Sequence, residues 1–158
     1  MKRMWSRNEL RKIIQETYGI DINNLIDKDG HLRFDGADGV GGTLEGLTIT
    51  YCKWSLSGTH LLMVVVGQIA DTTILSSGTT LAEYTLPAWI HNKIVATQTK
   101  LIEYKTIQAV SSGYSTQNIS TYLNKEDDNK LSIKVTTSIT LNSDKNFKVA
   151  FDLLIDND

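Results

Sequence analysis

The C-terminal part of the chain, from Lys130 to Ile155, has the clearest pattern of hydrophobic and polar positions. Apolar residues or threonine occupy every second position along 131–141 and again along 147–155, with mainly polar residues between them. This alternation is typical of half-buried β-strands. The five polar residues 142–146 separate the two runs, so the pattern predicts an antiparallel hairpin with a long loop. A lone hairpin is at best marginally stable in water, so its apolar face requires a second layer from the rest of the chain.

The region from Leu44 onward predicts further short strands separated by turns. In the first strand, Leu47, Ile49 and Tyr51 are expected on one face. The run Leu61–Val66 is continuously apolar, which indicates a strand covered on both sides, by a second sheet or by another subunit. Other expected strands lie at 81–86, 93–97, 101–110 and 117–123. Because no helical pattern separates these strands, the sequence predicts a mainly β fold, an antiparallel β-sandwich or jelly roll.

The first 43 residues have a different pattern from the rest of the chain. Ser6 and Glu9 have the spacing of a capping box, in which each side chain binds the other residue's backbone N–H at the start of a helix. Apolar residues then recur at helical spacing, which predicts one short α-helix over about 7–18. Residues 20–43 are rich in Asp-Gly and Gly-Gly pairs, typical of tight turns. We therefore expect a helix and Gly/Asp-rich linker at 1–43 and a β-sandwich head domain at 44–158.

Composition excludes several classes of function. The chain has 158 residues and a net charge of -2, so it has no broad positive field to attract nucleic acid. Its longest apolar run, Leu61–Val66, is too short to insert across a membrane. The single Cys52 permits no intrachain disulfide. The basic first residues lead into a polar helix rather than an apolar signal segment, so we expect synthesis in a cytoplasm.

Residues that could carry catalysis or hold a metal are few and scattered. His31, His60 and His91 form no His-x-His or His-x-x-x-His pair. The candidate carboxylates of a glycosidase, Glu45, Glu83 and Glu103, fall in different segments. The sequence therefore predicts no catalytic residue, no metal and no cofactor, and we do not expect an enzyme. A small β-sandwich hydrolase is the least favoured alternative.

A candidate binding site surrounds the polar segment Ser111–Thr116. Aromatic rings and amide groups gather there, and they suit sugars because rings stack on C–H faces while amides bind hydroxyls. The competing interpretation is that the tyrosines only cap the β core. The predicted ligand-binding residues are Tyr114, Gln117, Asn118 and Tyr122.

Three strings give the chain a likeness to a known class of protein. They are Tyr51–Gly67, Ala82–Ile90 and Phe151–Ile155, in which an apolar run precedes a turn, followed by a strand ending in Leu-Pro and a bend. Over about 44–155 the chain resembles the small β-rich head domains of bacteriophage tail fibre and receptor-binding proteins. The resemblance implies a trimeric jelly-roll head, joined by its N-terminal helix to other virion or tail proteins, in a particle made in a bacterial cytoplasm. It transfers no binding residue.

The leading hypothesis is therefore a phage-type structural protein of a tail or fibre that forms a homotrimer, and whose head either binds a host-surface glycan or only decorates the particle. Trimerisation suits this function because linked weak sites gain strongly in overall affinity. The alternative is a monomeric carbohydrate-binding module.

Overall fold

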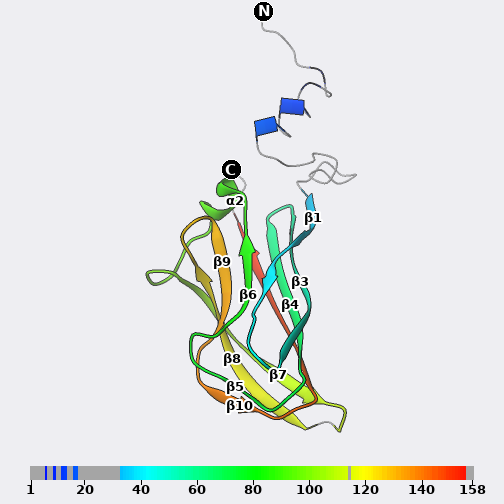
Figure 1. Cartoon of the computed structure of the whole chain (residues 1–158). Coiled ribbons are helices and arrows are strands. Elements are labelled where there is room, and N and C mark those ends of the chain that lie inside the picture. Colours follow the sequence, from blue (N-terminus) through cyan, green and yellow to red (C-terminus); the bar gives the residue numbers. More distant parts are fainter. Residues whose placement is uncertain are drawn as a thin grey trace, which may run out of the picture.

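The computed structural model describes Ser6, Glu9, Lys12, Ile13, Glu16 and Thr17 together with residues 33–113 and 115–155. Strands dominate these residues (Figure 1). They are β1 (Arg33–Asp38), β2 (Val40–Gly41), β3 (Leu47–Ser57), β4 (His60–Ile69), β5 (Thr73–Leu75), β6 (Thr80–Thr85), β7 (Leu101–Ser111), β8 (Thr116–Lys125), β9 (Lys130–Val135), β10 (Ile139–Leu141) and β11 (Lys145–Leu154). The helix α2 (Ala88–His91) follows the only proline, Pro87.

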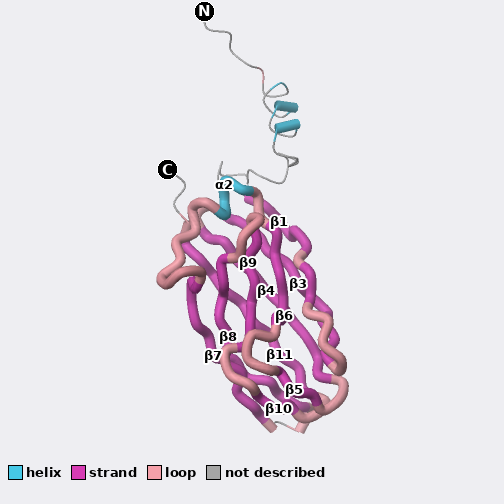
Figure 2. The backbone as a smooth tube through the Cα atoms, turned by 60° about the vertical axis from the view of Figure 1, so that its left-hand side comes forward, coloured by secondary structure: helices cyan, strands magenta, loops and turns pink. Residues whose placement is uncertain are grey.

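The strands form a large antiparallel sheet with the order β1-β3-β4-β11-β7-β8-β9-β6-β2, and a small sheet of β5 and β10. The large sheet folds into two layers because β11 pairs with β7 at only two positions, Lys145 with Ser111 and Asn146 with Val110. One layer is β1-β3-β4-β11 and the other is β7-β8-β9-β6-β2. Figure 2 shows α2 at one end of this body and β5 and β10 at the other. The prediction of a mainly β, antiparallel fold is confirmed.

The two layers are joined at two places, by the pairing of β11 with β7 and by the chain crossing at Gly39. Gly39 lies between β1, whose Asp38 pairs with Lys53 of β3, and β2, whose Val40 pairs with Glu83 of β6. A Cβ atom on Gly39 would lie 2.6 Å from Tyr84 Cδ1 and 2.7 Å from Cys52 Sγ, so only glycine fits this crossing. The large sheet is therefore nearly closed into a barrel.

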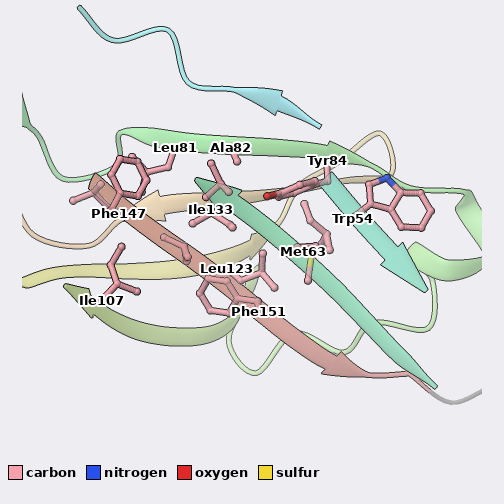
Figure 3. Packing of buried hydrophobic residues seen from close by; sticks show 14 of the residues in the cluster. Trp54, Met63, Leu81, Ala82, Tyr84, Ile107, Leu123, Ile133, Phe147 and Phe151 are labelled. Atoms are coloured by element: carbon pink, nitrogen blue, oxygen red, sulfur yellow. The ribbon is translucent and has the colours of Figure 1, made fainter. Parts of the chain in front are cut away.

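The core lies between the two layers and draws on both of them. Met63 of β4 and Phe151 of β11 meet Tyr84 of β6 and Leu123 of β8, and all four side chains are almost fully buried (Figure 3). Inward positions alternate along β11, as the sequence predicts, and Phe147 and Val149 continue the same face. This burial supplies the second layer that the C-terminal strands require.

The predicted hairpin between the two C-terminal runs is wrong. The run 131–141 breaks at Thr136–Ser138 into β9 and β10, and neither pairs with β11. Both edges of β9 are already taken, by β8 and by β6, so no edge remains for β11. Instead β11 pairs with β4 along its whole length.

A β-bulge reverses the outward and inward faces in the middle of β3. The register against β4 shifts between Ile49 and Tyr51, so Trp54 and Leu56 become the buried positions after the bulge. Tyr51 is 46% exposed, and its predicted place on the inward face is wrong. Alternation alone could not show this, because one extra residue changes the phase of a strand.

The N-terminal expectations have mixed outcomes. The Ser6 amide donates to Glu9 Oε2 over 2.8 Å and the Glu9 amide donates to Ser6 Oγ over 3.2 Å, which confirms the capping box. Glu9, Lys12, Ile13, Glu16 and Thr17 are helical, while the other residues of the predicted helix lie outside the described residues. The linker was expected to reach Thr43, but its last part forms β1 and β2 and belongs to the sheet.

The segment between α2 and β7 also differs from the prediction. A strand was expected at 93–97, but these residues form a turn and irregular chain after α2. Ile94 of this segment is 5% exposed and packs on the core without pairing in a sheet. This burial explains why the segment contains apolar residues.

Candidate tyrosine face

The hairpin of β7 and β8 brings two tyrosine rings together on the outer surface. Its register pairs Tyr104 with Tyr122, and the ring centroids lie 6.2 Å apart with 51° between the ring planes. This tilted arrangement is a favourable one for aromatic pairs. Tyr104 is 62% exposed and Tyr122 is half-buried, so the pair presents ring surface to solvent.

Hydroxyl groups continue this surface along both strands. Thr106 pairs with Ser120 in the next outward position, with 3.5 Å between Thr106 Oγ1 and Ser120 Oγ. Gln108 and Asn118 follow as the next pair, and both are exposed. We call the surface formed by Tyr104, Thr106, Ser120 and Tyr122 the tyrosine face. It combines rings with small hydrogen-bonding groups, the combination that sugar recognition uses.

Lys134, a cation on the strand next to Tyr122, is engaged by a carboxylate. Lys134 pairs with Tyr122 in the register of β8 and β9, and its Nζ lies 2.5 Å from Glu126 Oε1. Ser132 Oγ donates to the same oxygen over 2.6 Å. Burial raises the pKa of Glu126, but the hydrogen bonds from Lys134, Ser132 and Asn124 outweigh it and lower the pKa to about 2. Glu126 is therefore ionised at neutral pH and balances Lys134.

A second lysine near this hairpin is directed away from the face. Lys105 follows Tyr104 in β7, and its Nζ donates to the carbonyl of Ala150 in β11 over 2.5 Å. The same ammonium lies 5.8 Å from the centroid of the Phe151 ring. Lys105 thus bridges the two layers where β7 and β11 no longer pair. The tyrosine face is consequently flanked by lysines that are already bound.

The structure describes three of the four predicted ligand-binding residues and places them on two sides of β8. Asn118 and Tyr122 lie on the outward side of β8, and Tyr122 belongs to the tyrosine face. Gln117 lies on the opposite side, where its Nε2 donates to the Thr140 carbonyl and its Oε1 accepts from the Asn142 amide. Both ends of its amide thus hold the chain around β10. Tyr114 lies outside the described residues, and its role stays a prediction.

Lys145 binds Ser115, the residue that follows Tyr114 in the chain. It was expected in a polar turn, but it begins β11 and is 2% exposed. Its Nζ donates to the Ser115 carbonyl over 2.9 Å and to Ser115 Oγ over 3.3 Å. Ser115, next to the start of β8, is therefore held in place by a buried ammonium group.

Tyr104 was missed at the sequence level, although a signal for it exists. The strands 101–110 and 117–123 were both expected, and a hairpin centred on Gly113 places Tyr104 opposite Tyr122 by counting alone. The aromatic pair therefore follows from the positions of two strands and one turn.

The two described histidines, His60 and His91, have structural partners rather than catalytic neighbours, and His31 lies outside the described residues. His60 Nδ1 lies 3.1 Å from Asp152 Oδ1, and His91 Nε2 lies 3.1 Å from the Glu126 carbonyl oxygen. Within 33–113 and 115–155, no group of three or more His, Cys, Asp or Glu side chains could hold a metal ion. None of the helices in the described part of the chain has the length and the apolar character that a membrane span requires.

Three solved structures with a distant likeness to this chain are viral fibre or attachment proteins. No family model and no curated sequence matches it. The bovine atadenovirus type 4 fibre head has a TM-score of 0.34 and 9% identity over 70% of this chain and 99% of its own. The distal domain of the mouse adenovirus 2 fibre has a TM-score of 0.38 and 14% identity, with 82% and 74% covered.

A third similar structure is the reovirus attachment protein sigma1 in complex with α-2,3-sialyllactose. Its TM-score is 0.38 and its identity 6%, over 78% of this chain and 65% of that one. At such scores these likenesses establish neither a family nor a function for this chain. A bacteriophage origin likewise stays a prediction, and functional assignment rests on the chain's own residues.

Proposed function

We propose that this chain is a non-enzymatic attachment head that binds a glycan on the tyrosine face and acts as a homotrimer. The observation that carries the proposal is the exposed Tyr104–Tyr122 pair with hydroxyl groups beside it. Exposed ring faces stack on the C–H surface of a sugar, and threonine and serine hydroxyls both donate to and accept from its hydroxyls.

The charges around the tyrosine face favour a neutral glycan over an acidic one. Carboxylate and sulfate groups are usually bound by Arg or Lys side chains whose charge is not balanced within the protein. The charge of Lys134 is balanced by Glu126, and Lys105 extends to the Ala150 carbonyl in β11 rather than toward the tyrosine rings. The proposed ligand is therefore a neutral hexose-containing oligosaccharide, bound mainly by stacking and hydroxyl contacts.

Assembly would raise the strength of such a site. Single sugar contacts are weak, whereas several linked sites gain through effective concentration. We propose that residues 44–158 together with β1 and β2 form the head, and that the N-terminal helical segment joins it to other virion or tail proteins. A virion location and phage ancestry belong to this proposal and derive from the sequence resemblance.

A glycan array of neutral and sialylated oligosaccharides, probed with the full chain, tests the binding function. A ligand found there is then titrated in free form by calorimetry, so that each site is measured without avidity. We expect Tyr104→Ala and Tyr122→Ala each to weaken binding about tenfold, because each removes a stacking ring. Ile74→Ala is the matched control, since Ile74 is 61% exposed in β5 and lies outside the tyrosine face.

Two outcomes would reject the glycan proposal. One is an array without any bound oligosaccharide. The other is a ligand whose affinity neither tyrosine substitution changes. The mass of the chain in solution separates the leading proposal from its alternative, a monomeric carbohydrate-binding module, because the tyrosine face would serve either protein.

A further inference from the structure

One outer surface of the head remains apolar without a covering layer in the described chain. On β4, Leu61, Met63 and Val65 are fully buried, whereas Leu62 is 37% exposed and Val64 and Val66 are half-buried. The continuous apolar run predicted a strand covered on both sides, and only one side is covered by the second layer. A strand facing water on one side normally carries polar residues there.

The neighbouring strands extend this apolar surface. The register places Tyr51 of β3 beside Val66, and Ala150 of β11 beside Val64. Tyr51 faces outward because of the bulge in β3. We call the surface formed by Leu62, Val64, Val66, Tyr51 and Ala150 the valine face. Its members come from three adjacent strands and form one continuous apolar surface.

Opposite charges border the valine face on its two edges. On the β3 edge, Lys53 lies beside Val64 and its Nζ is 3.0 Å from Asp38 Oδ1. On the β11 edge, Asp152 lies beside Leu62 and its Oδ1 is 3.1 Å from His60 Nδ1, while Lys148 lies beside Val66. The contacts of Lys53 and Asp152 within the chain are both solvent-exposed, and surface pairs of this kind can exchange partners at little cost. Between Asp152 and Lys148 stands Ala150, whose small side chain permits close approach. Tyr51 and Lys148 flank the same residue, Val66, from opposite edges.

These two edges are complementary to each other when copies are arranged in a ring. A closed ring joins one edge of each copy to the other edge of the next, a heterologous contact. In such a ring, β11 of one copy runs parallel to β3 of the next. Asp152 then lies opposite Ser55 of the next copy, and Ser55 is one outward position away from Lys53. Outward positions along a strand are about 7 Å apart, within the reach of a lysine side chain. Lys148 comes level with Tyr51, where an ammonium can lie over the ring.

We propose that the valine face is the contact between copies of this chain, with β11 of one copy beside β3 of the next and β4 facing the common axis. This inference rests on the proposed function for the trimeric state and names the residues that form it. The apolar side chains of β4 supply the buried area, and the Lys53–Asp152 and Lys148–Tyr51 contacts set the register between copies.

Light scattering of the full chain over a range of concentrations tests this contact. The wild type is expected at three times the chain mass. Val64→Glu is expected to give a folded monomer at micromolar concentration, because it buries a charge at the centre of the contact. Ile74→Glu introduces the same charge at an exposed apolar position of β5 and is expected to keep the trimer.

A charge exchange tests the register. Lys53→Glu and Asp152→Lys are each expected to weaken the trimer about threefold at each contact, and the double variant is expected to regain most of the lost affinity. Asp71→Lys, in the exposed turn after β4, controls for the change in net charge. Circular dichroism confirms the fold of every variant.

The outcomes distinguish this inference from the proposed function. A trimer that Val64→Glu leaves intact would reject the valine face as the contact, while trimerisation itself would stand. A double variant without recovery would reject the Lys53–Asp152 register. A wild-type monomer at high concentration would reject both the contact and the trimer, and glycan titration would then decide for the monomeric module.

Discussion

The valine face and the tyrosine face are outer surfaces of the same two-layered sheet, yet they differ in chemistry. Behind both lie fully buried apolar residues, such as Val65 under the valine face and Leu123 under the tyrosine face. Outward, β4 presents Leu62, Val64 and Val66, whereas β7 and β8 present tyrosines and hydroxyls. The inward residues therefore account for the fold, and the outward residues distinguish a surface that suits protein contact from one that suits a polar ligand.

The largest predicted effect separates the inward from the outward side of the valine face. Val65→Asp places an unpaired charge in the core, where Val65 is fully buried, and is expected to abolish folding, at a cost above about 4 kcal/mol. Val64→Asp, the next residue, is expected to cost the isolated head only about 1 kcal/mol. Urea denaturation followed by circular dichroism measures both, and similar losses for the two variants would contradict the assignment of faces.

The second prediction concerns the seam that joins the layers bearing the two faces. Gly39→Ala is expected to destabilise the head by about 2 kcal/mol, because its Cβ would overlap Tyr84 and Cys52. Gly113→Ala is the control, since a Cβ there meets its nearest neighbour, Ser111 Oγ, at 4.0 Å. Equal stability of the two variants in thermal denaturation would show that the crossing at Gly39 is not tightly packed.

The third prediction concerns Glu126, whose carboxylate binds Lys134 beside the tyrosine face. Because the pKa of Glu126 is lowered from 4.5 to about 2, its stabilisation is complete above pH 4.5 and is lost as the pH falls toward 2. Glu126→Gln is expected to cost roughly 1–2 kcal/mol at pH 7 and to flatten stability between those pH values.

Urea midpoints at pH 7, 4.5 and 2.5 measure this difference. Val64→Asn provides a contrast outside the Glu126 network because it adds no titratable group, and its loss of stability should be the same at the three pH values. A wild type and a Glu126→Gln variant with parallel pH profiles would show that Glu126 is not held ionised.

The smallest predicted effect lies in the core between the two faces. The Tyr84 hydroxyl is buried, and the polar group beside it is the Cys52 thiol, which is only a weak hydrogen-bonding partner. Burial, together with the neighbouring Cys52 thiol, raises the pKa of Tyr84 far above its usual value. Tyr84→Phe is therefore expected to change stability by less than about 1 kcal/mol, and to stabilise if it changes anything. A thermal melt measures it, and a large loss would reveal a hydrogen bond to this hydroxyl.

Several features of the candidate surfaces follow from local sequence. The turn at Gly113 and the flanking strands predict the pairing of Tyr104 with Tyr122, although only Tyr122 was named as a site residue. The apolar run Leu61–Val66 predicted a strand covered on both sides, and the structure explains this run by an inner layer and an outward apolar surface. Gln117 lies on the side of β8 opposite to Asn118 and Tyr122, because neighbouring residues of a strand face opposite sides, so these residues are a cluster in sequence but not in space.

The sequence by itself determined that the chain is mainly β, which segments of 101–155 alternate, and that a capped helix begins near Ser6. These depend on local alternation, capping and turn residues. Only the tertiary structure decided that β11 pairs with β4 rather than with β9, that the bulge in β3 turns Tyr51 outward, and that Gly39 joins the layers. Strand partners and register depend on contacts between distant residues, and alternation gives a strand its faces without naming its neighbour.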